Sequence, residues 1–394
     1  MNEIFATVEF QMSLLLFVAI AGYLLAARIN QSAVIGEILF GMLIGPSVLG
    51  LITYTGFVEA LAHIGAVILL FVVGLEFKLK DILNGKAGVI AFFGVIIPWI
   101  AGYGVAQAFG IDFKGALFVG TALTATSIAI TASVLKEMGK LQTEAARVII
   151  GAAVIDDILG LLALSFTDQL ANSAVSFGVI GYVLFKCIAF LVLGVLLGQQ
   201  VINPIIKRID KSHLAKRYPE LIFIFAIMVA FAYGMVAEVI GLSAIVGAFI
   251  AGVSMEGIGL RHSKHYKEGA EYLHIIFAAV FFVSLGILAD ARQMNMQFVI
   301  FLIVLTLVAV ITKVVGCGIP ALLQKRSFKE SMIIGFGMSP RGEVAMIVAL
   351  IGLNEGLIGQ NVYVTIVLMS LLTTIITPIV LRRWMGSAVK ASRT

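Results

Sequence analysis

The sequence predicts an all-α polytopic membrane protein with about 13 transmembrane helices. Of its 394 residues, 61% are hydrophobic and only 12% are charged, whereas charged residues make up about 25% of a typical soluble domain. Apolar runs of about 17 to 25 residues recur along the chain, which suits helices that cross a bilayer and exceeds the strand length of an outer-membrane barrel. The 40 glycines fit this class, because glycine lets membrane helices approach closely.

Each long apolar run is interpreted as one membrane crossing, and the polar stretches between runs as connections. The expected helices cover about 4–27, 33–53, 57–76, 87–109, 114–135, 145–167, 176–205, 219–237, 240–256, 270–289, 296–323, 329–353 and 361–381.

Basic residues indicate how these helices are oriented. Connections after odd-numbered helices, together with the C-terminal tail, hold 22 Lys and Arg residues, whereas connections after even-numbered helices hold only Lys114 and Arg292. Cytoplasmic loops of membrane proteins are enriched in Lys and Arg. The pattern therefore predicts an external N-terminus and a cytoplasmic C-terminus, and we expect no appended cytoplasmic regulatory domain.

Thirteen helices divide into six, one and six, so the two groups of six are expected to form inverted repeats joined by the seventh helix. The fifth and twelfth helices correspond in such a repeat, and both carry an interruption. A polar cluster occupies about 121–127, and Pro340 lies among glycines in about 337–342, where it removes a backbone donor. We therefore expect two unwound helices, which mark the substrate site of many secondary transporters.

Two adjacent carboxylates, Asp156 and Asp157, lie inside an apolar run of the sixth helix. A charged side chain at the centre of a membrane helix costs about 2.5 to 3.5 kcal/mol on insertion scales, which makes the pair a candidate functional site. Adjacent helical residues point about 100° apart, so we expect different roles. Asp157 is predicted to face the unwound helices, and Asp156 to pair with a cation. The alternative is a polar helix end in a loop.

Three further charges lie within predicted helices and could support the site. Lys313 is deep in the eleventh helix and needs a counter-charge, for which Asp156 is the natural candidate. The alternative is a lysine that extends along its apolar stem to the membrane surface. Arg341 and Glu343 flank the break at Pro340, and are expected to compensate each other or the exposed helix dipoles, although a purely structural role stays open.

Oxygen ligands gather around these charges. Thr126 and Ser127 offer hydroxyl groups beside unwound carbonyls, and hard oxygen ligands suit a monovalent cation. We therefore predict ion and proton binding at Asp157, Asp156, Thr126 and Ser127, with Asp157 as the Na⁺ ligand. Glu37, near the inner end of the second helix, is either structural or part of a cytoplasmic funnel.

Other classes of chemistry find little support in the sequence. It contains no Walker-type phosphate loop, which disfavours an ATP-driven pump. Adjacent aspartates cannot converge from two helices as in an aspartyl protease. The five histidines lack metal-ligand spacing, and membrane topology explains the net positive charge better than nucleic-acid binding does. We expect no enzyme activity, no cofactor and no nucleic-acid partner.

Taken together, these motifs resemble the bacterial sodium/proton antiporters of the cation:proton antiporter superfamily, in particular the NapA-type, monovalent cation:proton antiporter-2 branch. The likeness rests on the Asp156–Asp157 pair, the polar cluster with Thr126 and Ser127, Lys313, the Pro-Arg-Gly-Glu segment, and Gly-Glu-Ile-Leu-Phe-Gly-Met-Leu-Ile-Gly-Pro at 36–46. It implies crossed unwound helices in one transmembrane transporter unit, 1–394.

The resemblance also implies a division of labour within this unit. An ion-translocating core is expected at about 86–170 and 295–386, a dimerisation domain at about 1–85 and 215–292, and a linker helix at about 175–210. The implied partners are monovalent cations, protons, membrane lipids and a second copy of the chain. The implied location is the bacterial plasma membrane, with a role in pH homeostasis.

The activity that the resemblance implies is exchange of cytoplasmic Na⁺, or Li⁺ or K⁺, for external H⁺. A paired-aspartate motif is associated in the family with electrogenic exchange, and protons are expected to compete with the cation for the aspartates. Three alternatives stay open: a K⁺/H⁺ antiporter, a sodium-coupled organic-anion symporter of related architecture, and a passive cation channel.

Overall fold

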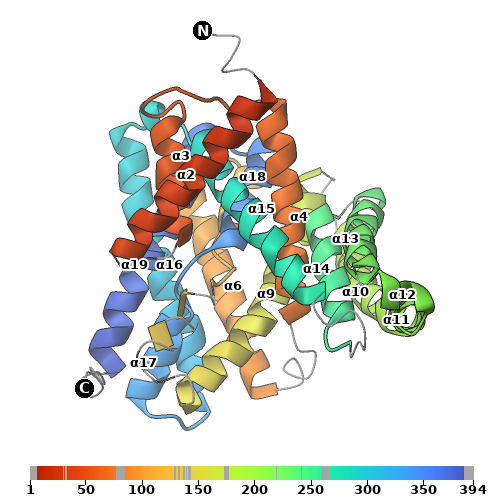
Figure 1. Ribbon diagram of the computed structural model, residues 1–394. Helices are drawn as coiled ribbons and strands as arrows, with labels where there is room; N and C mark the ends of the chain where they lie inside the picture. The colour runs from red at the N-terminus through yellow and green to blue at the C-terminus, as the bar shows by residue number, and fades with distance from the viewer. Residues whose placement is uncertain are drawn as a thin grey trace, which may run out of the picture. The chain divides into compact units, whose positions relative to one another are not determined.

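A computed structural model describes residues 7–385 apart from 30, 32, 77–84, 128–129, 132–133, 136–137, 139, 141–142, 173–176, 219, 241 and 259–265. Every regular element among these residues is a helix (Figure 1). The elements are α2 (Val8–Arg28), α3 (Ala33–Ile44), α4 (Gly56–Glu76), α6 (Gly85–Ala108), α7 (Phe113–Ala122), α9 (Glu144–Asn172), α10 (Phe177–Leu197), the π-helix η1 (Gly198–Ile202), α11 (Asn203–Asp210), α12 (His213–Arg217), α13 (Leu221–Val239), α14 (Ala244–Met255), α15 (Tyr266–Leu288), the 3₁₀ turn η2 (Ala291–Gln293), α16 (Met296–Leu323), α17 (Phe328–Gly337), α18 (Glu343–Asn354) and α19 (Gln360–Met385).

Many of these helices have the length and composition of membrane spans. Within the described part of the chain, nine are long and apolar enough to cross a bilayer, and the shorter apolar helices include α3, α14 and most of α18. The chain is therefore a multi-span helical membrane protein, as the sequence predicts. The count of about 13 crossings and their inverted repeat stay predictions.

One expected helix is shorter in the structure than in the sequence interpretation. The second helix was expected to reach residue 53, but α3 ends at Ile44. Gly45 and Pro46 follow, and a proline disfavours helical backbone in the residue before it. Turns then lead to Gly50, whose φ of +62° is accessible to glycine without strain. The apolar residues after Pro46 extend the hydrophobic run without extending the helix.

The helices group into two compact units. The first comprises Met1–Leu79 and Asp168–Asp290, and the second comprises Lys80–Thr167 and Ala291–Thr394. The ion-translocating and dimerising roles that the sequence suggests for parts of the chain stay predictions.

In the first unit, α4 packs against both α14 and α15, and α3 packs against α2 and α15. Small residues make these contacts close. A Cβ atom at Gly252 would lie 2.1 Å from the carbonyl oxygen of Phe71, and one at Gly74 would lie 2.3 Å from that of Phe249. Close backbone approach at small residues is the usual way in which membrane helices associate.

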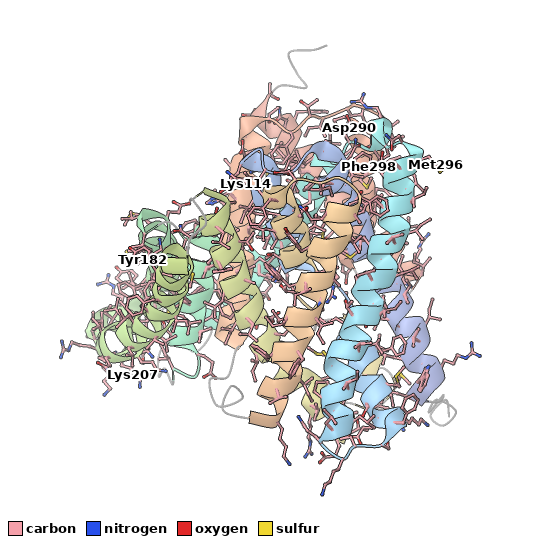
Figure 2. The ribbon with its side chains drawn as sticks, turned by 180° about the vertical axis from the view of Figure 1, so that it is seen from behind. Lys114, Tyr182, Lys207, Asp290, Met296 and Phe298 are labelled. Carbon is pink, nitrogen blue, oxygen red and sulfur yellow. The ribbon has the colours of Figure 1, made fainter. Side chains whose placement is uncertain are left out.

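The helix expected at 176–205 is a longer rod, formed by α10, η1 and α11 without a break in the helical backbone. It packs against α14 in the first unit. Asn203 donates a hydrogen bond to the carbonyl oxygen of Ser254 (2.9 Å), and Tyr233 donates to that of Gly194 (3.0 Å). Tyr182 and Lys207 lie on this rod (Figure 2).

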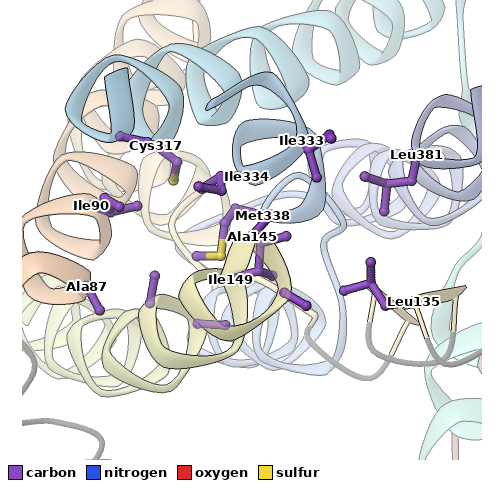
Figure 3. Close-up of a cluster of buried hydrophobic side chains, with 14 of the residues drawn as sticks. Ala87, Ile90, Leu135, Ala145, Ile149, Cys317, Ile333, Ile334, Met338 and Leu381 are labelled. Carbon is purple, nitrogen blue, oxygen red and sulfur yellow. The ribbon is translucent and has the colours of Figure 1, made fainter. Parts of the chain in front are cut away.

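In the second unit, α6 and α16 pack closely, and α17 and α19 pack against α16. A cluster of buried apolar side chains joins these helices to α9 (Figure 3). Ile90 of α6, Ile149 of α9, Cys317 of α16 and Ile334 of α17 all belong to it and are fully buried or nearly so. Lys114 and Met296 lie near the same end of this unit (Figure 2). The cluster fixes the helices that carry the candidate site.

Candidate functional site at two helix breaks

Two helices of the second unit are interrupted where the sequence predicts unwinding. The first, α7, ends at Ala122, and residues 125–127 are not helical. The second, α17, ends at Gly337, and the chain becomes helical again only at Glu343, where α18 begins. Both breaks leave backbone groups without their helical partners, and such groups need other partners inside a membrane protein.

The two breaks supply partners to each other. The backbone N–H of Ser127 donates to the carbonyl oxygen of Pro340 at 2.8 Å, and the Thr126 hydroxyl donates to that of Met338 at 3.1 Å. The Thr131 hydroxyl adds a bond to the carbonyl oxygen of Gly337 at 2.6 Å. These bonds place the two unwound segments side by side, as the resemblance to crossed-helix antiporters implies.

A buried ion pair connects α9 with α16. The ammonium nitrogen of Lys313 donates to Oδ1 of Asp156 at 2.6 Å, and both side chains have no exposed surface. The other carboxylate oxygen, Oδ2, has no hydrogen-bond partner among the described residues. Lys313 therefore has the counter-charge that the sequence predicts, and one oxygen of Asp156 is left for a proton or another donor.

Room for this pair comes from a glycine on α6. A Cβ atom at Gly94 would lie 3.6 Å from both the Asp156 and the Lys313 charged groups, and only 2.6 Å from Sγ of Cys317. A Cβ atom at Gly316 would lie 2.7 Å from the carbonyl oxygen of Phe93. Two glycines thus let α6 and α16 cross closely beside the ion pair.

Arg341 is a second fully buried cation at the breaks. Its Nη1 donates to the carbonyl oxygen of Ala125 in the first break at 3.0 Å, and its Nη2 donates to that of Ala309 in α16 at 2.9 Å. The guanidinium thus neutralises carbonyl dipoles of an unwound segment and a neighbouring helix. The structure thus brings Arg341 to a carbonyl oxygen of the first break, and its role in compensating the helix dipoles stays a prediction.

The backbone of Arg341 is held from α19. Its N–H donates to the hydroxyl of Thr373 at 3.0 Å, and its carbonyl accepts a bond from the hydroxyl of Thr374 at 3.1 Å. Both threonines are buried. Two hydroxyl side chains thereby take the place of the helical bonds that the break at Pro340 removes.

The remaining predicted residues are placed as follows. Asp157 follows Asp156 on α9 and is half-buried, and Ser127 is buried in the first break. The side chain of Glu343 lies outside the described residues, so its expected pairing with Arg341 stays a prediction. Glu37 is buried on α3 in the first unit. Its funnel role also stays a prediction.

Among the residues that the structure describes, no group of three or more His, Cys, Asp or Glu side chains could hold a metal ion. A cation at the breaks would instead meet carboxylate, hydroxyl and carbonyl oxygens. These are the ligands that weakly held, hard cations use.

Comparison with known proteins agrees with this geometry. Residues 14–386 match the family model described as sodium/hydrogen exchanger, transmembrane. The chain belongs to the sodium/hydrogen exchanger family. Within it, the chain is 33% identical over 387 residues to the Na⁺/H⁺-K⁺ antiporter GerN of Bacillus cereus, covering 98% of both chains. It is 32% identical to an Na⁺/H⁺ antiporter of Enterococcus hirae, covering 94% of this chain and 96% of that one.

The fold of this exchanger also matches a solved structure. The sodium proton antiporter MjNhaP1 of Methanocaldococcus jannaschii superposes with a TM-score of 0.73, and the match covers 95% of this chain and 96% of that one. At 18% sequence identity, this likeness establishes a shared fold.

Several residues around the site were missed by sequence reasoning. Gly94 and Cys317 shape the space around the ion pair, and Thr373 and Thr374 hold the second break. The adjacent threonines in an apolar helix are a visible signal of backbone bonding. Gly94 carries no such signal, because it is one of many glycines in the sequence.

Proposed function

We propose that this exchanger is a secondary antiporter that moves a monovalent cation, Na⁺ in the first instance, out of the cytoplasm in exchange for protons. The observation that carries the proposal is the buried Asp156–Lys313 pair beside two crossed helix breaks. Buried ionisable groups in a membrane protein are expensive and mark ion pathways. The names of GerN and of the Enterococcus hirae relative, both Na⁺/H⁺ antiporters, support the same class.

In this proposal Asp157 binds the cation, with oxygen ligands from Thr126, Ser127 and the unwound backbone. A carboxylate can hold a cation or a proton, so the two ions compete for it. Asp156 is bonded to Lys313 through Oδ1 only. Protonation of Asp156 weakens its attraction for Lys313, so the ion pair is proposed to break and re-form as the site exchanges a proton for a cation.

The breaks serve alternating access. Arg341 and the bonds between the two unwound segments keep the broken backbone satisfied while ions enter and leave. Exchange is proposed to be electrogenic, because the Asp156–Asp157 pair and Lys313 together allow more than one proton per cation. The proposed setting is the bacterial plasma membrane, with the C-terminus in the cytoplasm and the chain as a homodimer.

A K⁺/H⁺ exchange activity is the second candidate, because the related protein GerN is named as an Na⁺/H⁺-K⁺ antiporter. Fluorescence-monitored antiport in vesicles with Na⁺, Li⁺ and K⁺ separates the two candidates. Proton efflux driven by Na⁺ or Li⁺ supports Na⁺/H⁺ antiport. Proton efflux driven equally well by K⁺ supports an antiporter that uses both Na⁺ and K⁺. Na⁺-driven uptake of an organic anion without proton countertransport would overturn antiport.

A further inference from the structure

A groove on the surface of the second unit lies between α17 and α19. Its volume is about 660 Å³, and it is lined by Phe336, Ile379, Val380, Arg383 and Trp384. The two helices pack against each other, and Figure 1 shows them at the end of the unit where the C-terminus is marked. Four of the five lining residues are apolar or aromatic, so the groove suits a hydrocarbon chain.

The apolar part of the groove is fixed to the core of the unit. The rings of Phe336 and Trp384 lie 6.2 Å apart between centroids, and both pack against the buried cluster of Figure 3. Ile379 is 64% exposed and is accessible to a ligand. Tryptophan is enriched at membrane interfaces, which places this end of α19 near lipid headgroups.

Two basic residues lie at the α19 end of the groove. Arg382 and Arg383 form the last turn of α19, and both are exposed. The distribution of Lys and Arg along the chain assigns this side to the cytoplasm, where the lipid surface is negatively charged.

We propose that this groove binds an anionic phospholipid, with an acyl chain along Phe336, Ile379 and Trp384 and the phosphate at Arg383. The combination favours a lipid over a free phosphate, because the lining is apolar except for Arg383. It favours an anionic lipid over a zwitterionic one, because Arg382 and Arg383 are cationic. The site is independent of the proposed ion exchange.

Native mass spectrometry of the purified full-length chain tests this proposal. Phosphatidylglycerol and phosphatidylcholine with identical acyl chains are titrated separately, and the apparent affinity of the first retained lipid is measured. Arg383→Gln should weaken phosphatidylglycerol binding about fivefold, the usual contribution of one basic side chain at a membrane surface. Ile379→Trp, which fills the groove and keeps both arginines, should weaken it at least as much.

Lys207→Gln is the matched control, because Lys207 is an exposed basic residue of α11 in the other unit and should leave lipid retention unchanged. Equal losses in Arg383→Gln and Lys207→Gln, or equal retention of the two lipids by the unsubstituted chain, would overturn the proposal. The spectra also report how many copies associate. A change in that number without a change in lipid retention would make the groove a contact between copies instead.

Discussion

The ammonium nitrogen of Lys313 lies 2.6 Å from Oδ1 of Asp156, and neither side chain is exposed. The pair joins α9 to α16 inside the second unit. Desolvating two charges is expensive, so a buried pair adds little net stability, but removing one partner leaves a buried charge unpaired and costs about 3–5 kcal/mol. The two residues should therefore behave as a unit when either is changed.

This coupling predicts the outcome of a double substitution. Lys313→Ala should lower the melting temperature of the purified protein markedly, because Asp156 loses its counter-charge. Adding Asp156→Asn to Lys313→Ala should recover much of the loss, because no unpaired charge is then left. The measurement is thermal unfolding in detergent, followed by intrinsic fluorescence. A double variant that is less stable than Lys313→Ala alone would show that the pair is not the source of the effect.

Gly94 of α6 leaves space for the Asp156–Lys313 pair. Its substitution should therefore disturb the pair without changing either charged residue. Gly94→Ala places a Cβ atom 2.6 Å from Sγ of Cys317 and 3.6 Å from both charged groups. We expect a lower melting temperature and a changed apparent affinity for the transported cation. Cys317→Gly in the same chain should restore both, because it removes the sulfur atom that the new methyl group meets.

Gly104 gives the control for this experiment. It lies in the same helix, and nothing lies within 4 Å of the position that its Cβ atom would take. Gly104→Ala should be neutral or stabilising by up to about 1 kcal/mol, the difference in helix propensity between the two residues. If both alanine variants have the same stability and cation affinity, the crowding attributed to Gly94 is wrong.

Arg341 should not be replaceable by lysine. Its guanidinium donates to carbonyl oxygens on two different elements, at Ala125 and Ala309, and a lysine ammonium lacks that planar fork. Each hydrogen bond from a charged group contributes about 1.5–3 kcal/mol. Arg341→Lys should therefore lower both thermal stability and the rate of exchange in proteoliposomes. If Arg341→Lys has the wild-type stability and exchange rate, only the positive charge of Arg341 matters and its planar hydrogen-bonding geometry does not.

Competition at one carboxylate predicts how exchange depends on pH. Where Asp157 is mostly protonated, each unit decrease in pH should raise the apparent KM for Na⁺ up to about tenfold through this carboxylate alone, because its proton must leave before a cation binds there. The maximal rate at saturating Na⁺ should change far less. Initial rates measured over a series of Na⁺ concentrations and pH values check this. A KM that is independent of pH would exclude direct competition.

Much of the site could be predicted because buried charges constrain their surroundings strongly. A lysine deep in an apolar helix needs a counter-charge, and few carboxylates lie in the apolar runs, which is why Asp156 and Lys313 could be paired from sequence. Pro340 among glycines and the polar residues near Thr126 similarly predict the two breaks. These signals are local in sequence, and each violates the apolar pattern around it.

The remaining features of the site depend on how the helices cross, which the local sequence does not specify. The partners of Arg341 are backbone carbonyls at Ala125 and Ala309, and any residue type could provide them. The role of Gly94 depends on the opposing Cys317 in another helix. The premature end of α3 at Ile44 was missed because the apolar residues that follow Pro46 continue the hydrophobic signal.

The proposal that Asp157 carries the exchanged ions is tested most directly by Asp157→Asn in proteoliposomes. Proton movement driven by an Na⁺ gradient is measured with an internal pH dye. Glu144→Gln serves as the matched control, because Glu144 is a highly exposed carboxylate in the first turn of the same helix. We predict that Asp157→Asn abolishes Na⁺-dependent proton flux while Glu144→Gln retains it. Sustained flux in Asp157→Asn would contradict the assignment of Asp157 as the ion and proton site.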